Sequence, residues 1–125
     1  MNKEFIPYEQ ALALKELGFN ESCFGYHLNN EFQFFANIRS CNTNSEFGFY
    51  PTALTYSQAF RWFREKYKLE AIVQKADDFS WYKFTIYFYL SDSKGFVDSY
   101  HEFNTYEEAE LACLIKLIEI VKEKK

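Results

Sequence analysis

The sequence predicts one α+β domain over residues 1–125, with helices packed on an antiparallel sheet in the order α-β-β-α-β-β-β-α. Three observations lead to this fold class. Segments whose apolar residues recur with the helical period alternate with segments of period two. The chain has no internal repeat and no low-complexity linker. Hydrophobic residues make up 48% of it, with only four glycines and two prolines, which is typical of a chain that buries a core without disulfides or metal.

The N-terminal third predicts a helix followed by a hairpin. Pro7 suits the first position of a helix over residues 7–17, whose residues are strong helix formers, and Gly18 suits the stop after it. The segments "CFGYHL" and "FQFFANI" then flank Asn29-Asn30. Because asparagine tolerates the positive φ of a tight turn, we expect these two segments to pair as a hairpin.

The middle of the chain predicts an irregular segment and a second helix. The longest stretch without a period is "RSCNTNSEFGFYP", and we expect residues 39–50 to be the mobile part of the molecule. Thr55 and Gln58 have the spacing of a capping box, in which each side chain bonds the backbone N–H of the other residue. They predict a helix over residues 56–67.

The C-terminal half predicts three strands and a third helix. The segments "LEAIVQK", "SWYKFTIYFYL" and "FVDSYHEF" are separated by Asp77-Asp78 and by "SDSKG", which favours a three-stranded antiparallel meander. Thr105 and Glu108 form a second capping box, and we expect the helix that it opens to run to about residue 122. Acidic residues near its start and lysines near its end suit the helix dipole.

The strand "WYKFTIYFYL" has an aromatic or aliphatic side chain at eight of its ten positions, which is more than one buried face requires. The face that we expect to be core consists of Tyr82, Phe84, Ile86, Phe88 and Leu90. The second face consists of Trp81, Lys83, Thr85, Tyr87 and Tyr89. We expect a helix, for example the first one, to cover this second face and bury Tyr87. The alternative is a surface for a ligand or a partner.

Two of the predicted helices carry apolar residues beyond a single buried stripe. Trp62 projects off the stripe of its helix, so it packs under residues 39–50 or forms a pocket with Arg61. The C-terminal helix is apolar over more than half of its circumference. Such a helix is buried on two sides, either by its own chain or by a second subunit. On this ground we predict a homodimer.

The reactive residues form no catalytic constellation. Cys23, Cys41 and Cys113 are odd in number and widely spaced, which predicts free thiols, with Cys113 packed inside its helix. His27 and His101 lie in predicted strands, where we expect ordinary hydrogen bonds rather than a metal ion. The phosphate-binding and nucleophile motifs are missing. We therefore argue against an enzyme and expect no cofactor; an enzyme that acts through either histidine is the third hypothesis.

Charge and hydropathy argue against two classes of partner. A net charge of -4 opposes binding to phosphate backbones, so nucleic acid is not expected as a partner. No stretch approaches the length of a membrane span, and the N-terminus lacks the apolar region of a signal peptide. These two features predict a cytoplasmic protein with no membrane partner.

One resemblance concerns topology alone. From residue 55 onward the order α-β-β-β-α resembles the double-stranded RNA-binding domain, and "NTYEEAELACLIKLIEI" stands where that family begins its last helix. The family holds phosphates there with lysines, whereas this chain has Glu107, Glu108 and Glu110. Because glutamates cannot hold phosphates as those lysines do, the resemblance implies a similar order of helices and strands but no RNA binding.

A second resemblance is carried by short strings. The segments "IPYEQALALKELGF", "CFGY", "QAFRWFREKY" and "NTYEEAELACLIKLIEI" resemble a group of short uncharacterised proteins of gut Bacteroidales and their phages. This resemblance implies a setting, an accessory gene of a phage or mobile element, and no mechanism. Small proteins in that setting often act by binding, for example by inhibiting or sequestering a component of host defence.

Two functions from different classes are compatible with these features. We favour a protein-interaction module that acts through the C-terminal helix or through the aromatic second face of the strand at 81–90. The alternative is a small-molecule binder, for example of a nucleotide, that stacks its ligand between aromatic rings and pairs its anion with Arg39, Arg61 or Arg64. The candidate binding residues are Trp62, Arg61, Trp81, Lys83, Tyr87 and Tyr89.

Overall fold

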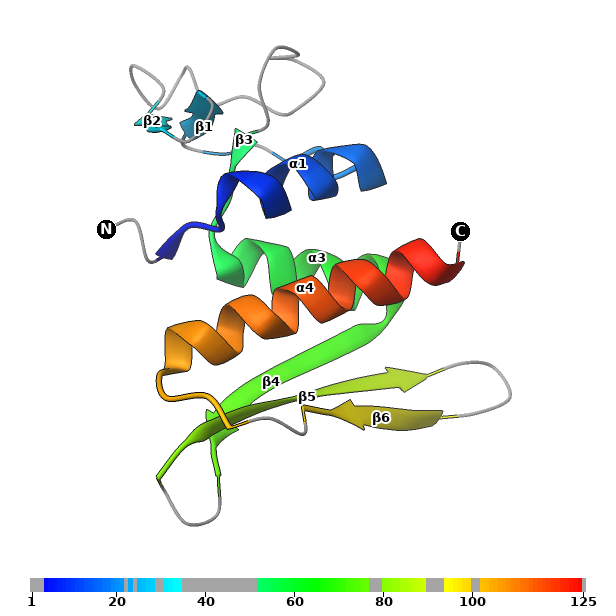
Figure 1. The fold of residues 1–125 in the computed structure, drawn as a ribbon. Helices are drawn as coiled ribbons and strands as arrows, with labels where there is room; N and C mark the ends of the chain where they lie inside the picture. Colours follow the sequence, from blue (N-terminus) through cyan, green and yellow to red (C-terminus); the bar gives the residue numbers. More distant parts are fainter. Residues whose placement is uncertain are drawn as a thin grey trace. The chain divides into compact units, whose positions relative to one another are not determined.

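In the computed structural model the chain consists of two compact units, Met1–Gln58 and Ala59–Lys125 (Figure 1). The residues that the structure describes are 4–21, 23, 25–28, 31–34, 52–76, 80–89, 94–99 and 102–124. Their helices and strands follow in the order α1, β1, β2, β3, α3, β4, β5, β6 and α4. The single domain predicted over the whole chain stays a prediction.

Helix α1 (Tyr8–Leu17) of the first unit ends where it was predicted to end, but it begins one residue later than the predicted range of 7–17. Pro7 stands at its N-cap with φ near -65°. The helix ends at Gly18, whose φ of 102° lies in the left-handed region that glycine enters without strain. The backbone N–H of Gly18 donates to the Lys15 carbonyl at 3.1 Å, which satisfies one of the last helical carbonyls.

The sheet of the first unit contains the predicted hairpin. Strands β1 (Gly25–Leu28) and β2 (Glu31–Phe34) pair antiparallel, with Leu28 opposite Glu31. A two-residue strand, β3 (Thr52–Ala53), pairs with the other edge of β1 and gives the order β2-β1-β3. The sequence did not predict β3, because two residues are too few to display a period.

Helix α3 (Tyr56–Tyr67) begins and ends as predicted. The backbone N–H of Gln58 donates to Thr55 Oγ1 at 3.1 Å, and the backbone N–H of Thr55 donates to Gln58 Oε1 at 3.2 Å, so the capping box is confirmed. One residue, Lys68, separates α3 from the next strand and has a φ of 60°. Its Nζ donates to the Glu65 carbonyl at 3.3 Å.

The second unit contains the predicted meander. Strands β4 (Leu69–Lys75), β5 (Tyr82–Tyr89) and β6 (Lys94–Asp98) form an antiparallel sheet in the order β4-β5-β6. Strand β6 begins two residues before the predicted segment, at Lys94 within the predicted separator, and it ends earlier than predicted. Beyond Asp98 the Phe84 backbone N–H donates to the Ser99 side-chain Oγ at 3.0 Å instead of to a backbone carbonyl. The regular ladder ends at that point, and pairing resumes with an isolated bridge between Tyr82 and Phe103.

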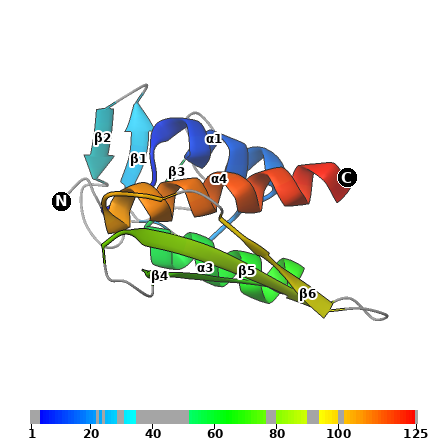
Figure 2. The same cartoon turned by 60° about the horizontal axis from the view of Figure 1, so that its bottom comes forward.

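Helix α4 (Tyr106–Lys124) lies along one side of this sheet in both views (Figures 1 and 2) and packs against β4 and β5. The Glu108 backbone N–H donates to Thr105 Oγ1 at 3.1 Å, as the capping box predicts. The Glu108 carboxylate instead accepts from the Asn104 backbone N–H at 3.3 Å, one residue before the predicted partner. The buried residues of α4 are Ala109, Cys113, Leu114, Leu117, Ile118 and Val121.

The predicted α+β class, with helices on an antiparallel sheet, is confirmed. The structure differs from the prediction in having two three-stranded sheets, one in each unit, among the residues that it describes. Within that part of the chain, no helix combines the length and the apolar character that crossing a membrane requires.

Candidate functional site

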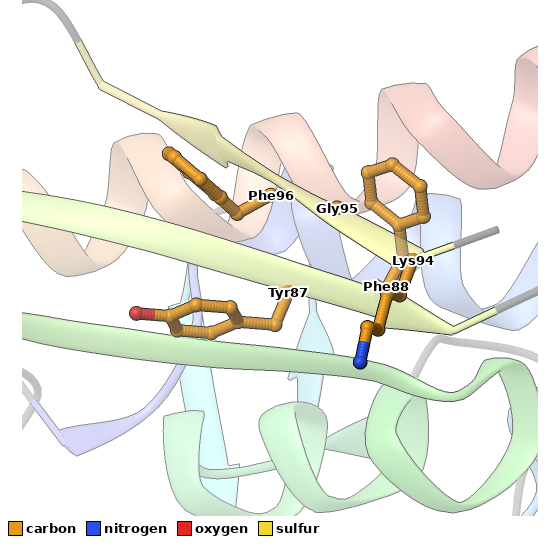
Figure 3. A pocket seen from close by; sticks show the side chains of 5 residues that line it. All are labelled: Tyr87, Phe88, Lys94, Gly95 and Phe96. Atoms are coloured by element: carbon orange, nitrogen blue, oxygen red, sulfur yellow. The ribbon is translucent and has the colours of Figure 1, made fainter.

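The sheet β4-β5-β6 has two faces of different character. The register places Phe84 and Ile86 of β5 on the face that α4 covers, and both are buried. Tyr87 of β5 and Phe96 of β6 lie opposite each other on the other face, and Figure 3 shows their side chains on the near side of the sheet with α4 behind it. We call this second side the open face; its residues are Glu70, Ile72, Gln74, Lys83, Thr85, Tyr87, Lys94, Phe96 and Asp98.

Three large apolar side chains of the open face are exposed. Phe96 is 61% exposed, Tyr87 39% and Ile72 40%. The rings of Tyr87 and Phe96 are neighbours, with centroids 6.1 Å apart and planes inclined at 49°. Isolated apolar residues on a surface need no explanation, but an aromatic pair on an uncovered strand face is typical of a surface that binds another molecule.

A hollow of about 300 Å³ lies at the end of β5 and β6, lined by Tyr87, Phe88, Lys94, Gly95 and Phe96 (Figure 3). Its shape depends on Gly95, which stands opposite Phe88 in the ladder. A Cβ at Gly95 would lie 2.8 Å from Phe88 Cζ, so a larger residue would displace the ring. The hollow therefore combines aromatic walls with one cation, the ammonium of Lys94.

A hydrogen bond fixes the polar part of the open face. Thr85 Oγ1 donates to Asp98 Oδ1 at 2.6 Å, from the central strand to its neighbour. Thr85 is buried on the open face, where its neighbours Lys83 and Asp98 are half-buried, so the bond satisfies a hydroxyl that would be costly to leave without a partner. The same bond holds the Asp98 carboxylate in place beside Phe96 along the strand.

The expectation that a helix covers the second face and buries Tyr87 is wrong, because Tyr87 is exposed. Lys83 lies on the open face and Trp81 just before β5, and both are half-buried. Tyr89 belongs to β5 and pairs with Lys94, but its side chain lies outside the described part of the structure. Of the predicted binding residues, Tyr87 and Lys83 therefore share the open face.

Trp62 and Arg61 do not lie on the open face, because both belong to α3. Trp62 is 7% exposed, and its ring contacts Phe63 and Tyr67 edge-on at 5.1 and 5.4 Å. Lys66 Nζ lies 5.2 Å from the centre of the Trp62 ring, a cation–π contact. Arg61 and Arg64 are exposed. The predicted cover of Trp62, residues 39–50, lies outside the described residues, as does Arg39.

Phe96, Lys94 and Ile72 are among the open-face residues that sequence reasoning missed. The available signal was the alternation within "KGFVD", which places Lys94, Phe96 and Asp98 on one side of a strand. This alternation identifies a shared side without saying which side faces the helix. The register with β5 decides that, and register depends on pairing rather than on the residues of one strand.

The predicted reactive residues are placed in the core. His27 lies in β1 as expected, buried, with a hydrogen bond to the Ile6 backbone and an edge contact to Tyr8. Burial lowers the pKa of His27, and the hydrogen bond to the Ile6 backbone partly opposes this effect. Cys113 is a buried free thiol, as predicted, and Cys23 is buried, with its Sγ donating to the Glu21 carbonyl at 3.5 Å. Cys41 and His101 lie outside the described residues.

The residues that the structure describes include no group of three or more histidine, cysteine, aspartate or glutamate side chains placed to hold a metal ion. Comparison of the chain with protein-family models, with curated proteins and with solved structures gives no match. The interpretation of the open face therefore depends on its own geometry.

Proposed function

We propose that this protein is a non-catalytic binding protein and that it recognises a protein partner through the open face of the β4-β5-β6 sheet. The observation that carries the proposal is the exposure of Phe96, 61%, directly beside the exposed Tyr87. Aromatic side chains supply much of the energy of protein interfaces, because they bury a large area with few rotatable bonds.

The polar surroundings of the aromatic pair support a protein partner. Glu70 and Gln74 are exposed along β4, and Lys94 is exposed at the start of β6. An apolar centre with a polar rim is the usual anatomy of a protein interface. The face also belongs to hydrogen-bonded strands, which fix the backbone from which the rings project before binding.

A small-molecule binder is the second candidate, and the hollow beside Lys94 is the observation that favours it. Its volume of about 300 Å³ is at the lower end for ligand sites. Three aromatic side chains and an ammonium would suit a flat anionic ligand such as a nucleotide. Native mass spectrometry of the purified protein separates the two candidates, because it detects a co-purified ligand as an added mass.

The biological setting is part of the proposal and is supported only by the short strings shared with proteins of gut Bacteroidales and their phages. In that setting the protein is a cytoplasmic accessory protein of a phage or mobile element, and its partner is a host protein such as a component of defence. The net charge of -4 and the exposed Glu107 and Glu108 at the start of α4 disfavour nucleic acid as the partner.

Site-specific photo-crosslinking in cells tests the proposal. A photoreactive phenylalanine analogue at position 96 should crosslink to a discrete protein of different mass from this chain. The matched control is the same analogue at Ile115, which is 44% exposed on α4. Replacing Tyr87 with serine should abolish the crosslink from position 96 while the protein stays folded. Equal crosslinking from both positions, or a crosslink that survives the Tyr87 change, would contradict the proposal.

A further inference from the structure

Strand β6 is an edge of its sheet, and its outer side pairs with no strand among the described residues (Figure 2). The Ser99 backbone N–H, next along the chain, donates to the Phe84 carbonyl at 2.9 Å. In an antiparallel ladder, successive residues direct their backbone N–H and C=O alternately toward the neighbouring strand and away from it. Counting back from Ser99, the residues whose backbone groups point outward are Lys94, Phe96 and Asp98.

The sequence of β6, "KGFVD", is complementary to itself in antiparallel pairing. We propose that a second copy of this chain pairs along the outer edge of β6, with a two-fold axis at Phe96. In this register Lys94 of each copy lies opposite Asp98 of the other, and Phe96 lies opposite Phe96. Side chains directly opposite each other in a sheet have Cβ atoms about 5 Å apart, close enough for an ion pair and for ring contact.

Backbone and side chains agree on this register. Lys94, Phe96 and Asp98 are the residues with outward N–H and C=O groups, so each would exchange hydrogen bonds with the residue opposite it. The same alternation places their three side chains together on the open face. If the register were shifted by one residue, residues with outward backbone groups would face residues whose groups point inward, and these could not hydrogen-bond. Lys94 and Asp98 of the two copies would also no longer lie opposite each other.

The charges at the two ends of β6 are available for such a pair. Lys94 is exposed and makes no ion pair within the described part of the chain. The Thr85 hydroxyl donates to Asp98 Oδ1, which leaves Oδ2 for the ammonium of a second copy. The Thr85 bond also orders the carboxylate in advance, so less side-chain freedom is lost when the pair forms.

Pairing would also extend the open face. Phe96 of each copy contacts Tyr87 of its own chain at 6.1 Å between ring centroids. Two-fold pairing would place the two Phe96 rings side by side, so four aromatic rings would form one row across the two joined sheets. This inference goes beyond the proposed function, because it assigns a second copy to the edge of β6 and leaves the widened face for another partner.

The reciprocity of the charges favours a second copy over a foreign strand. A foreign peptide that adds to this edge needs only a compatible backbone and a contact for Phe96. Binding such a peptide does not require that β6 carry a positive charge two residues before Phe96 and a negative charge two residues after it, as Lys94 and Asp98 do. A symmetric pair requires that pattern, because each end of the strand meets the other end of its copy.

Light scattering of the full chain over a range of concentrations tests the proposal. The parent protein should approach twice the mass of one chain, 15.0 kDa, as concentration rises. The variants K94E and D98K each oppose like charges at both ends of the paired strands. Each should weaken the dimer by roughly tenfold or more. An equimolar mixture of the two variants should form a heterodimer, because both opposing pairs then regain opposite charges.

The matched control is E70K, a charge reversal on the open face at the other edge of the sheet, which should leave the dimer unchanged. Circular dichroism checks that each variant is folded. A parent that stays monomeric at all concentrations overturns the proposal, as does a foreign strand bound to β6 of a monomer. Folded variants that fail to associate when mixed also overturn it. A monomeric parent whose crosslink from position 96 still depends on Tyr87 would leave the proposed function in place.

Discussion

Both faces of the β4-β5-β6 sheet carry large apolar side chains, but these side chains lie in opposite environments. Phe84 and Ile86 lie under α4 and are buried, whereas Tyr87, the next residue along β5, is exposed. On the neighbouring strand Phe96 is the most exposed of the large apolar residues that the structure describes. The burial of a ring in this sheet is therefore decided by the element that packs on its side and not by the apolar character of the strand.

The difference also separates stability from recognition. A ring under a helix contributes to folding, because its area is removed from water when the chain folds. A ring on an uncovered strand face keeps part of its area in water, and that area can still be buried when a partner binds. The covered face is thus expected to respond to substitution in folding measurements, and the open face in association measurements.

The largest expected effect concerns Cys113 in the covering helix. Burial, with the nearby Glu110 as a smaller cause, raises the pKa of its thiol from 9.0 to about 12. This shift alone lowers the reactive thiolate near neutral pH by roughly a thousandfold. Native Cys113 should resist iodoacetamide, and the guanidinium-unfolded chain should react fast, as read by peptide mass spectrometry. Rapid labelling of the native protein would show that α4 is misplaced.

The two isoleucines of the sheet provide a direct test of the comparison. Ile86→Ala, on the covered face at 0% exposure, should lower the free energy of unfolding by about 2 to 5 kcal/mol, because it leaves a cavity under α4. Ile72→Ala, the same chemical change on the open face, should cost no more than about 1 kcal/mol. Urea unfolding measures both. Equal losses would mean that the two faces are equally covered.

A smaller effect concerns Glu110, a half-buried residue of α4. Burial, and to a lesser degree the charge of Glu107, raises the pKa of its carboxyl from 4.5 to about 7. The folded protein therefore binds more protons than the unfolded chain between these two values, so this group makes stability fall as the pH rises from about 4.5 through about 7.

Replacing Glu110 with glutamine should remove this dependence. The variant should be more stable than the parent at pH 8 and should show a flatter melting temperature between pH 5 and pH 8. The control is Glu119→Gln, an exposed residue of the same helix. An unchanged pH dependence in the Glu110 variant would show that its carboxyl titrates as in water.

The smallest expected effect concerns Tyr87. Replacing it with serine should change the free energy of unfolding by no more than about 1 kcal/mol, because the ring is partly solvated and loses mainly its contact with Phe96. Thermal melting monitored by circular dichroism measures this change. A loss of several kcal/mol would mean that a further element covers the open face, and the comparison between the faces would fail.

Local signals predicted the elements well. The capping box at Thr55 and Gln58 placed the start of α3, and Gly18 placed the end of α1. These signals are reliable because the residues satisfy backbone groups within one turn of themselves. The inward side of β5, with Phe84 and Ile86, was also predicted from period two alone.

The candidate site was predicted only in part, because it depends on contacts between strands. The sequence identified Tyr87 as an aromatic residue on the second face. It did not show that Phe96 is its neighbour, because that depends on the register in which β5 pairs with β6. The end of β6 was also missed, because the Ser99 side chain replaces a backbone carbonyl as the acceptor for Phe84. Neither event leaves a periodic signal within one strand.

The single-residue link between α3 and β4 has a consequence for protein engineering. Lys68 reverses the chain alone, in a left-handed conformation, with its ammonium on the Glu65 carbonyl. A link of one residue has no further residues that could rearrange around an insertion. An inserted tag or loop would therefore have to unwind the end of α3 or shift the register of β4. This junction should be among the least permissive insertion points in the second unit, and fusion partners are better attached elsewhere.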